Sequence, residues 1–159
     1  MKHDIFIDNN IASKFSNPAD QEYKNLIRWL MDNHNLAQGQ DDDRAYLVVS
    51  RKLIAEYGRS CQTASGATSI HVIINKLTQE GRLVFISNQN IKDFKNLYFT
   101  KVIERKFRSN QEDRDHIPVV LLSERKYALS YDKNFTYDLE HFPGFKVIVR
   151  SRPEDLQYE

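Results

Sequence analysis

Three apolar residues, Ile5 to Ile7, stand together near the start of the sequence, and they limit the possible folds more than any other feature. A strand that is apolar on both sides is buried on both faces, as in a parallel sheet between two layers of helices. In open α/β sheets, ligands bind outside the carboxyl ends of the strands. Asp8 follows the run directly, so its carboxylate is predicted to face a ligand site.

Further strands and helices alternate along the chain. The strand predictions cover 46–49, 83–86, 128–131 and 146–149, and the helix predictions cover 11–15, 21–31, a helix capped by Ser50, a helix from Ile70 that stops at Gly81, a basic helical region from Lys92, and 117–122. Strands that alternate with amphipathic helices predict an α/β fold. We expect a single three-layer domain, residues 1–150, with a mainly parallel central sheet, and then a polar C-terminal tail, 151–159.

Composition agrees with one folded domain. The 159 residues fit a single unit, and 40% hydrophobic with 28% charged residues indicates a folded, soluble protein. No apolar stretch approaches the ~20 residues of a membrane helix, so we expect no membrane association and a cytoplasmic location. The one cysteine, Cys61, excludes an internal disulfide and a multi-cysteine zinc site, and its expected role is packing.

Basic residues are the candidate contacts for nucleic acid. The net charge of +1 gives no overall field for a polyanion, so binding depends on local groups. Segment 92–114 combines basic residues, which neutralise phosphates, with aromatic residues, which stack on bases. A charged helix whose aromatic residues belong to the core has the same pattern, so both interpretations stay open. The candidate contacts are Arg51, Arg59, Lys101, Arg105 and Arg108.

Acidic residues recur at the ends of strands and the starts of helices. Glu56 lies in the helix after the second strand, Asp115 precedes a late apolar helix, and Asp132 follows the fourth strand. Asp113, two residues before Asp115, is an alternative for that position. Singly, such residues are explained as helix caps, solvated helix residues or Asx-turns. Together with Asp8 they make four carboxylates that would converge on one cleft and attract a hard divalent cation.

The acidic positions, in this order, resemble those of PIN-domain ribonucleases. Asp8-Asn9-Asn10-Ile11 is similar to the opening motif of that family, which is an aspartate, any residue, an asparagine and an apolar residue. Ser130-Tyr131-Asp132 is similar to the closing motif of a serine or threonine, any residue and an aspartate. Glu56 and Asp115-His116-Ile117 resemble the acidic positions between them. The region 83–114 carries no motif of the family.

The resemblance implies a ribonuclease that depends on Mg²⁺ or Mn²⁺ and hydrolyses RNA phosphodiester bonds at the acidic residues. Asp8 and Asp115 would hold the principal ion, Asp132 would complete the metal site, and Glu56 would orient the attacking water or a second ion. The supporting residues would be Asn10, Ser130 and Asp113.

The same resemblance implies partners and leaves alternatives open. The substrate would be RNA, including single-stranded RNA, and the protein would be either the toxin of a toxin–antitoxin pair or an RNA-processing enzyme. An antitoxin and a second copy in a homodimer are the implied protein partners. One alternative is a catalytically silent PIN-like nucleic-acid-binding or scaffold domain, whose carboxylates pair with Arg51 and Arg59. The other is a receiver-like signalling domain, which stable aspartyl phosphorylation would reveal.

Overall fold

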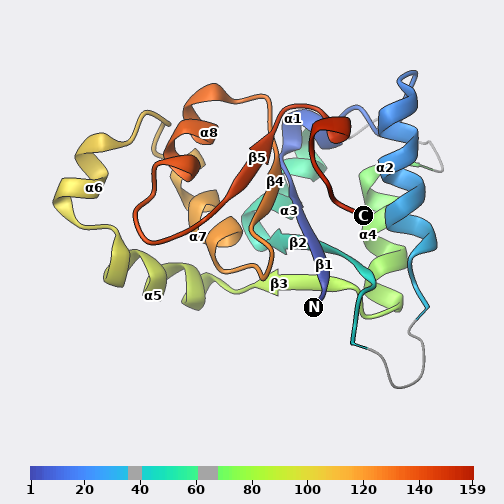
Figure 1. Ribbon diagram of the computed structural model, residues 1–159, viewed down its shortest axis with the longest axis horizontal. Coiled ribbons are helices and arrows are strands. Elements are labelled where there is room, and N and C mark those ends of the chain that lie inside the picture. Colours follow the sequence, from blue (N-terminus) through green and yellow to red (C-terminus); the bar gives the residue numbers. More distant parts are fainter. Residues whose placement is uncertain (36–40, 61–67) are drawn as a thin grey trace.

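A five-stranded parallel sheet, in the order β3-β2-β1-β4-β5, forms the centre of the fold (Figure 1). The computed structural model describes residues 1–35, 41–60 and 68–159, so Cys61 lies outside the described residues. The strands are β1 (His3–Ile7), β2 (Ala45–Ser50), β3 (Leu83–Ile86), β4 (Tyr127–Leu129) and β5 (Ile148–Arg150). The helices are α1 (Asn9–Ala12), α2 (Gln21–Asp32), α3 (Arg51–Ser60), α4 (Ile70–Gln79), α5 (Asn88–Tyr98), α6 (Lys101–Lys106), α7 (His116–Leu121) and α8 (Lys133–Glu140), with the 3-10 helices η1 (Asp113–Asp115) and η2 (Pro153–Asp155). The prediction of an α/β fold with a parallel sheet is confirmed.

The uninterrupted apolar runs occupy the inner strands of this sheet. Ile5 pairs with Leu47 and Phe6 with Val48, and all of these side chains are fully buried. β3 lies at an edge, and there Phe85 is 54% exposed. Strands covered on both faces are apolar on both sides, which is why the runs on β1 and β2 are continuous.

Helices cover both faces of the sheet and make three layers (Figure 1). α2 and α4 pack on one face, while α7 and α8 lie on the other, from which α5 and α6 extend sideways. α2 buries Tyr23, Leu26 and Leu30 at helical spacing, whereas every residue of α7 is buried. Pro118 lies in the first turn of α7, where its missing N–H removes no helical hydrogen bond. In the part of the chain that the structure describes, no helix is both long and apolar enough to cross a membrane.

The strand order reverses beside β1, and this reversal locates the candidate site. β2 and β3 lie on one side of β1, whereas β4 and β5 lie on the other. The last residues of β1 and β4, Ile7 and Leu129, are paired in the sheet. Ligands of open α/β sheets bind outside the carboxyl ends of the strands at such a reversal. Asp8 and Ser130 come next in the chain and therefore lie at this position.

Several boundaries differ from those that the sequence predicts. The pattern indicates two helices between the third and fourth strands, but the structure has three, α5, α6 and α7. β4 ends at Leu129 and does not reach Tyr131, because the chain turns at Ser130 toward α8. β5 begins at Ile148 and not at Lys146.

Residues 151–159, which the sequence sets apart as a polar tail, pack against the domain. Leu156 and Tyr158 are buried. The Tyr158 ring lies edge-on to the Trp29 ring of α2, with 5.0 Å between centroids, and Arg125 donates a hydrogen bond to the Tyr158 carbonyl at 2.8 Å. These two apolar side chains, separated by one polar residue, anchor a segment whose average composition is polar.

Arg82 is fully buried near the opposite end of the strands from Asp8. Its guanidinium donates to the carbonyls of Leu30 at 2.6 Å and Met31 at 3.4 Å, in the last turn of α2. It also donates to the carbonyl of Ala45, the first residue of β2, at 2.9 Å, and pairs with Glu80 at 2.7 Å. Carbonyls in the last turn of a helix lack intrahelical partners, so Arg82 satisfies them and joins α2 to the sheet.

Candidate active site

Asp8 is held firmly between β1 and β4. Its backbone N–H donates to the Leu129 carbonyl at 2.9 Å, which continues the pairing of the two strands. As the N-cap of α1, its carboxylate accepts a hydrogen bond from the Asn9 N–H at 2.8 Å. The other carboxylate oxygen accepts from the Ser130 hydroxyl at 2.5 Å. The position of Asp8 is therefore fixed by backbone and side-chain contacts together.

Ser130 connects Asp8 to Asp132. Its hydroxyl oxygen accepts a hydrogen bond from the Asp132 N–H at 3.1 Å while its proton goes to Asp8. Asp132 is the N-cap of α8 and accepts from the N–H groups of Asn134 and Phe135 at 2.9 and 3.0 Å. Asn10 accepts from the Tyr131 N–H at 3.3 Å. Two of the three predicted supporting residues, Ser130 and Asn10, thus link the chain after β1 to the chain after β4.

Asp113 lies in η1 beside the same two aspartates. Partial burial raises the pKa of Asp113, and repulsion from Asp132 and Asp8, together with a side-chain hydrogen bond to Asp132, raises it further. His116 acts in the opposite direction. Carboxylates that repel one another retain protons to a higher pH, so Asp113 belongs to one electrostatic group with Asp8 and Asp132.

Asp115 is instead engaged by two lysines. Its oxygens form ion pairs with Lys52 at 2.8 Å and with Lys95. Partial burial by itself would raise the pKa of Asp115, but the hydrogen bonds from Lys52 and Lys95 outweigh it, and the pKa is lowered. Asp115 therefore ties η1 to α3 and α5. Of the two candidates for this acidic position, Asp113 interacts with Asp8 and Asp132, whereas Asp115 pairs with the two lysines.

Glu56 completes the group from α3, and His116 holds it there. The His116 Nε2 lies 2.9 Å from both carboxylate oxygens of Glu56. The side chains of Glu56 and His116 are 18% and 3% exposed. The His116 ring packs near the rings of Phe6 and Phe135, at 5.9 and 6.5 Å between centroids, so its orientation is fixed by the core.

Four acids from distant parts of the chain, here called the acidic cluster, consist of Asp8, Glu56, Asp113 and Asp132. Burial raises the pKa of Asp8, and repulsion from Glu56 adds to this effect. The hydrogen bonds from Ser130 and from the Asn9 N–H, together with His116, lower the pKa of Asp8 but do not reverse the shift. The donor set of the acidic cluster consists of carboxylate oxygens, which suit Mg²⁺ and Mn²⁺. As the side chains stand, no three His, Cys, Asp or Glu residues in the described ranges are grouped tightly enough to hold a metal ion.

His116 and Asn9 are site residues that the sequence pattern does not identify. Both carry a buried polar atom, His116 Nδ1 and Asn9 Oδ1, that has no hydrogen-bond partner among the described residues. His116 adjoins the candidate Asp115 in the sequence, but its partner Glu56 lies 60 residues away. Only the fold reveals that pairing.

The predicted nucleic-acid contacts are exposed. Arg51 and Arg59 lie on α3, Lys101 and Arg105 on α6, and Arg108 follows α6. These side chains form no ion pair with another described residue. The aromatic residues of the same segment behave differently. Phe94, Phe99 and Phe107 pack with Phe142 and Phe145 in one group of rings. These phenylalanines therefore serve as core.

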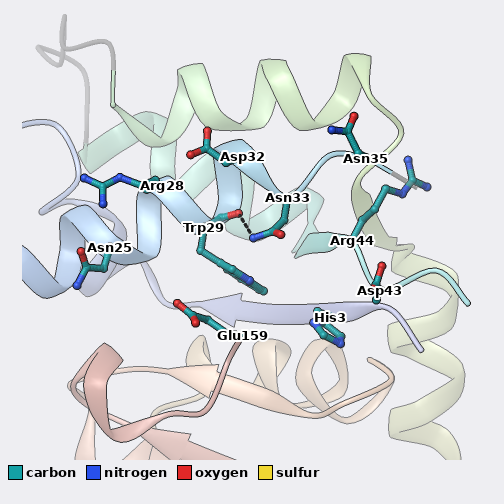
Figure 2. A pocket seen from close by; sticks show the side chains of 10 residues that line it. All are labelled: His3, Asn25, Arg28, Trp29, Asp32, Asn33, Asn35, Asp43, Arg44 and Glu159. Carbon is teal, nitrogen blue, oxygen red and sulfur yellow. Dashed lines mark hydrogen bonds between the residues drawn. The ribbon is translucent and has the colours of Figure 1, made fainter. Parts of the chain in front are cut away.

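A hollow of about 580 Å³ lies at the opposite end of the sheet from the acidic cluster (Figure 2). His3 of β1 lies at its floor. Trp29 of α2 and Asn33, the C-cap of that helix, line its wall, and the Asn33 side-chain amide donates a hydrogen bond of 3.1 Å to the Trp29 carbonyl. Its charged lining is mixed in sign, with Arg28 and Arg44 beside Asp32, Asp43 and Glu159. The acids outnumber these two arginines, so the hollow has no excess of positive charge that would select a polyanion.

Comparison with known proteins adds no assignment to this geometry. The sequence matches no protein-family model, no curated protein and no solved structure. The function is therefore inferred from the fold and from the acidic cluster.

Proposed function

We propose that this protein is a divalent-metal-dependent ribonuclease of the PIN-like type, acting at the acidic cluster. One observation carries the proposal. Asp8, Asp113 and Asp132, from three distant parts of the chain, interact with one another beyond the carboxyl ends of β1 and β4, where the strand order reverses. The pKa values of Asp8 and Asp113 are raised, and groups with such shifts gather at functional sites.

The acidic cluster has the chemistry of a Mg²⁺ or Mn²⁺ site. Asp8, Asp113 and Asp132 would hold the ion, and its charge would relieve the repulsion among them. The chemistry that such a cation supplies is activation of a water for attack on phosphorus and stabilisation of the charge on the leaving oxygen. In the net reaction, water adds across one P–O bond of the RNA backbone, and no protein nucleophile is consumed.

Other residues of the site would position these groups. Ser130 holds Asp8 and the start of α8 in fixed relation. Glu56, oriented by His116, would accept a hydrogen bond from the attacking water. Lys52 and Lys95 are occupied by Asp115, so they do not neutralise the acidic cluster.

The same proposal covers biological setting and partners. We propose a cytoplasmic enzyme that cuts RNA, including single-stranded RNA, either as the toxin of a toxin–antitoxin pair or as an RNA-processing enzyme. An antitoxin and a second copy of the chain are the protein partners that this setting would provide.

A second candidate function is a catalytically silent PIN-like domain that binds nucleic acid or serves as a scaffold. Two observations favour it. Glu56 is already paired with His116, and no three metal-binding side chains are grouped tightly in the described ranges. In that case the carboxylates act as caps, as Asp8 and Asp132 do for α1 and α8.

Cleavage of a mixed single-stranded RNA pool by the purified protein with Mg²⁺ or Mn²⁺ separates the two functions. We expect cutting that EDTA and Asp8→Asn abolish. Two neighbouring acids supply a matched pair of variants, because Asp113→Asn should also abolish cutting whereas Asp115→Asn should retain it. Absence of both cutting and metal binding in the wild-type protein would refute the nuclease and favour the silent domain.

A further inference from the structure

A second pocket, of about 560 Å³, lies between α8 and the segment that leads from α6 toward η1. Its apolar lining comprises Ile103, Phe107, Phe142 and Pro143. Its ionisable lining comprises Lys106, Arg108, Asp138 and His141. We propose that this pocket, here called the α6–α8 pocket, binds one nucleotide of a single-stranded RNA. This assignment rests on the proposed ribonuclease function for its biological meaning, but its binding test does not.

The charge of the α6–α8 pocket favours an anion. Its one acid, Asp138, is 3% exposed and already engaged, because it accepts from the N–H groups of Arg108 and Ser109 at 2.8 and 2.9 Å and from the Ser109 hydroxyl at 2.5 Å. Lys106 and Arg108 are exposed, and neither side chain has an ion-pair or hydrogen-bond partner among the described residues. Two cations whose side-chain hydrogen-bond donors have no partner among the described residues are suited to bind a backbone phosphate.

Arg108 is also held in a defined position. Its guanidinium carbon lies 3.4 Å from the centroid of the Tyr137 ring, and the His141 ring stacks on Tyr137 at 3.8 Å. His141 Nδ1 lies 2.9 Å from the Tyr137 carbonyl. A carbonyl only accepts, so Nδ1 donates and Nε2 remains for a ligand. A preorganised guanidinium loses less entropy on binding phosphate than a mobile one.

The apolar floor suits a base. Phe142 is buried, while Phe107 and Ile103 are partly buried, and Pro143 adds an apolar surface without an N–H. A phosphate at Lys106 and Arg108 with its base against this floor uses both halves of the lining. An acidic peptide would use the cations but would leave the aromatic floor in contact with water or with short polar side chains.

Both walls of the α6–α8 pocket continue into the acidic cluster. α8 begins at its N-cap Asp132 and rises about 8 Å along its axis between that residue and Tyr137, at 1.5 Å per residue. The other wall passes from Arg108 through Asn110, whose side chain accepts from the Asp113 N–H at 2.9 Å. A strand with one nucleotide in the pocket would therefore bring a neighbouring phosphate toward Asp113 and Asp132.

The test measures the affinity of the Asp8→Asn protein for a short fluorescein-labelled single-stranded RNA from the fluorescence anisotropy of the label. EDTA is present so that no RNA is cut. Lys106→Gln with Arg108→Gln should weaken binding about tenfold or more, because hydrogen bonds from a charged donor to a phosphate are stronger than those between neutral groups. The slope of log affinity against log salt should fall by about 0.7 for each phosphate that the double variant no longer neutralises. Lys24→Gln with Arg28→Gln removes the same charges from exposed residues of α2 and should change affinity little.

Equal loss of affinity in both double variants, or no loss in either, would overturn the assignment. So would RNA binding too weak to measure beside tight binding of a glutamate-rich peptide, which would identify an acidic peptide as the ligand. The nuclease proposal is judged separately, from metal-dependent cutting by the wild-type protein. Specific RNA binding by a protein that neither cuts RNA nor binds metal would support the α6–α8 pocket and refute the nuclease. Metal-dependent cutting with an RNA affinity that the Lys106 and Arg108 variants leave unchanged would support the nuclease and overturn the pocket assignment.

Discussion

Replacement of Arg82 by methionine should destabilise the protein by about 3–5 kcal/mol, the range for removal of one partner from a buried charged network. Arg82→Met keeps most of the side-chain volume but removes every donor. The carbonyls of Leu30, Met31 and Ala45 then lose their hydrogen bonds from the guanidinium. A buried acceptor without a partner costs about 1–3 kcal/mol. Three such carbonyls would cost about 3 kcal/mol or more. The expected loss stays within about 3–5 kcal/mol because water can donate to some of these carbonyls in the variant.

The assay is urea unfolding at neutral pH, followed by the fluorescence of Trp29, the one tryptophan of the chain. Trp29 is 6% exposed and lies next to Leu30, so it reports on the region that Arg82 holds. For a chain of this size, the expected loss lowers the melting temperature by roughly 6–20 °C. Arg51→Met is the control, because Arg51 is exposed and such a change stays within about 0.5 kcal/mol. A loss below about 1 kcal/mol for Arg82→Met would refute the bracing role.

Three more predictions concern the charged groups of the site. The folded-state pKa of Asp8 is raised, so its ionisation destabilises the folded protein once the pH exceeds the pKa of Asp8 in the unfolded chain. Asp8→Asn should therefore have a higher melting temperature than wild type at pH 7 and the same melting temperature near pH 3. A lower melting temperature of the variant at pH 7 would contradict this. The pKa of Asp115 is lowered, so its contribution is present at neutral pH and disappears as pH falls through the folded pKa. Asp115→Asn should therefore cost less than ~1 kcal/mol at pH 7 and nothing in acid, as measured by urea unfolding at both pH values. Ser130→Ala removes a hydrogen bond that lowers the pKa of Asp8, and NMR titration of the Asp8 carboxyl carbon should show a higher pKa.

The sheet can be predicted from the sequence because its signal is local. Runs such as Ile5–Ile7 are apolar at every position, which indicates burial on both faces. The helix capped by Ser50 is equally predictable, and the Ser50 hydroxyl accepts from the Leu53 N–H at 3.1 Å. Strand ends are harder to predict, since a single polar residue, Ser130, turns the chain away from β4.

The candidate site can be predicted only in part, because its selection depends on residues far apart in the chain. Asp113 and Asp115 are equivalent in sequence context. Lys52 and Lys95, 63 and 20 residues from Asp115, engage that acid and leave Asp113 beside Asp8. His116 could not be predicted from the sequence for the same reason, because its partner Glu56 is distant in the chain and α3 brings the two side chains together. The phenylalanines of segment 92–114 are ambiguous in sequence, and the structure places them in or against the core, where they pack with Phe142 and Phe145.

The central claim is that the acidic cluster, with Asp113 and not Asp115 as its third aspartate, binds a divalent cation. Calorimetric titration of Mn²⁺ into wild type, Asp113→Asn and Asp115→Asn tests it most directly. We expect wild type and Asp115→Asn to bind Mn²⁺ with similar affinity and Asp113→Asn to lose binding. Absence of binding in all three proteins, or loss in Asp115→Asn with retention in Asp113→Asn, would contradict it.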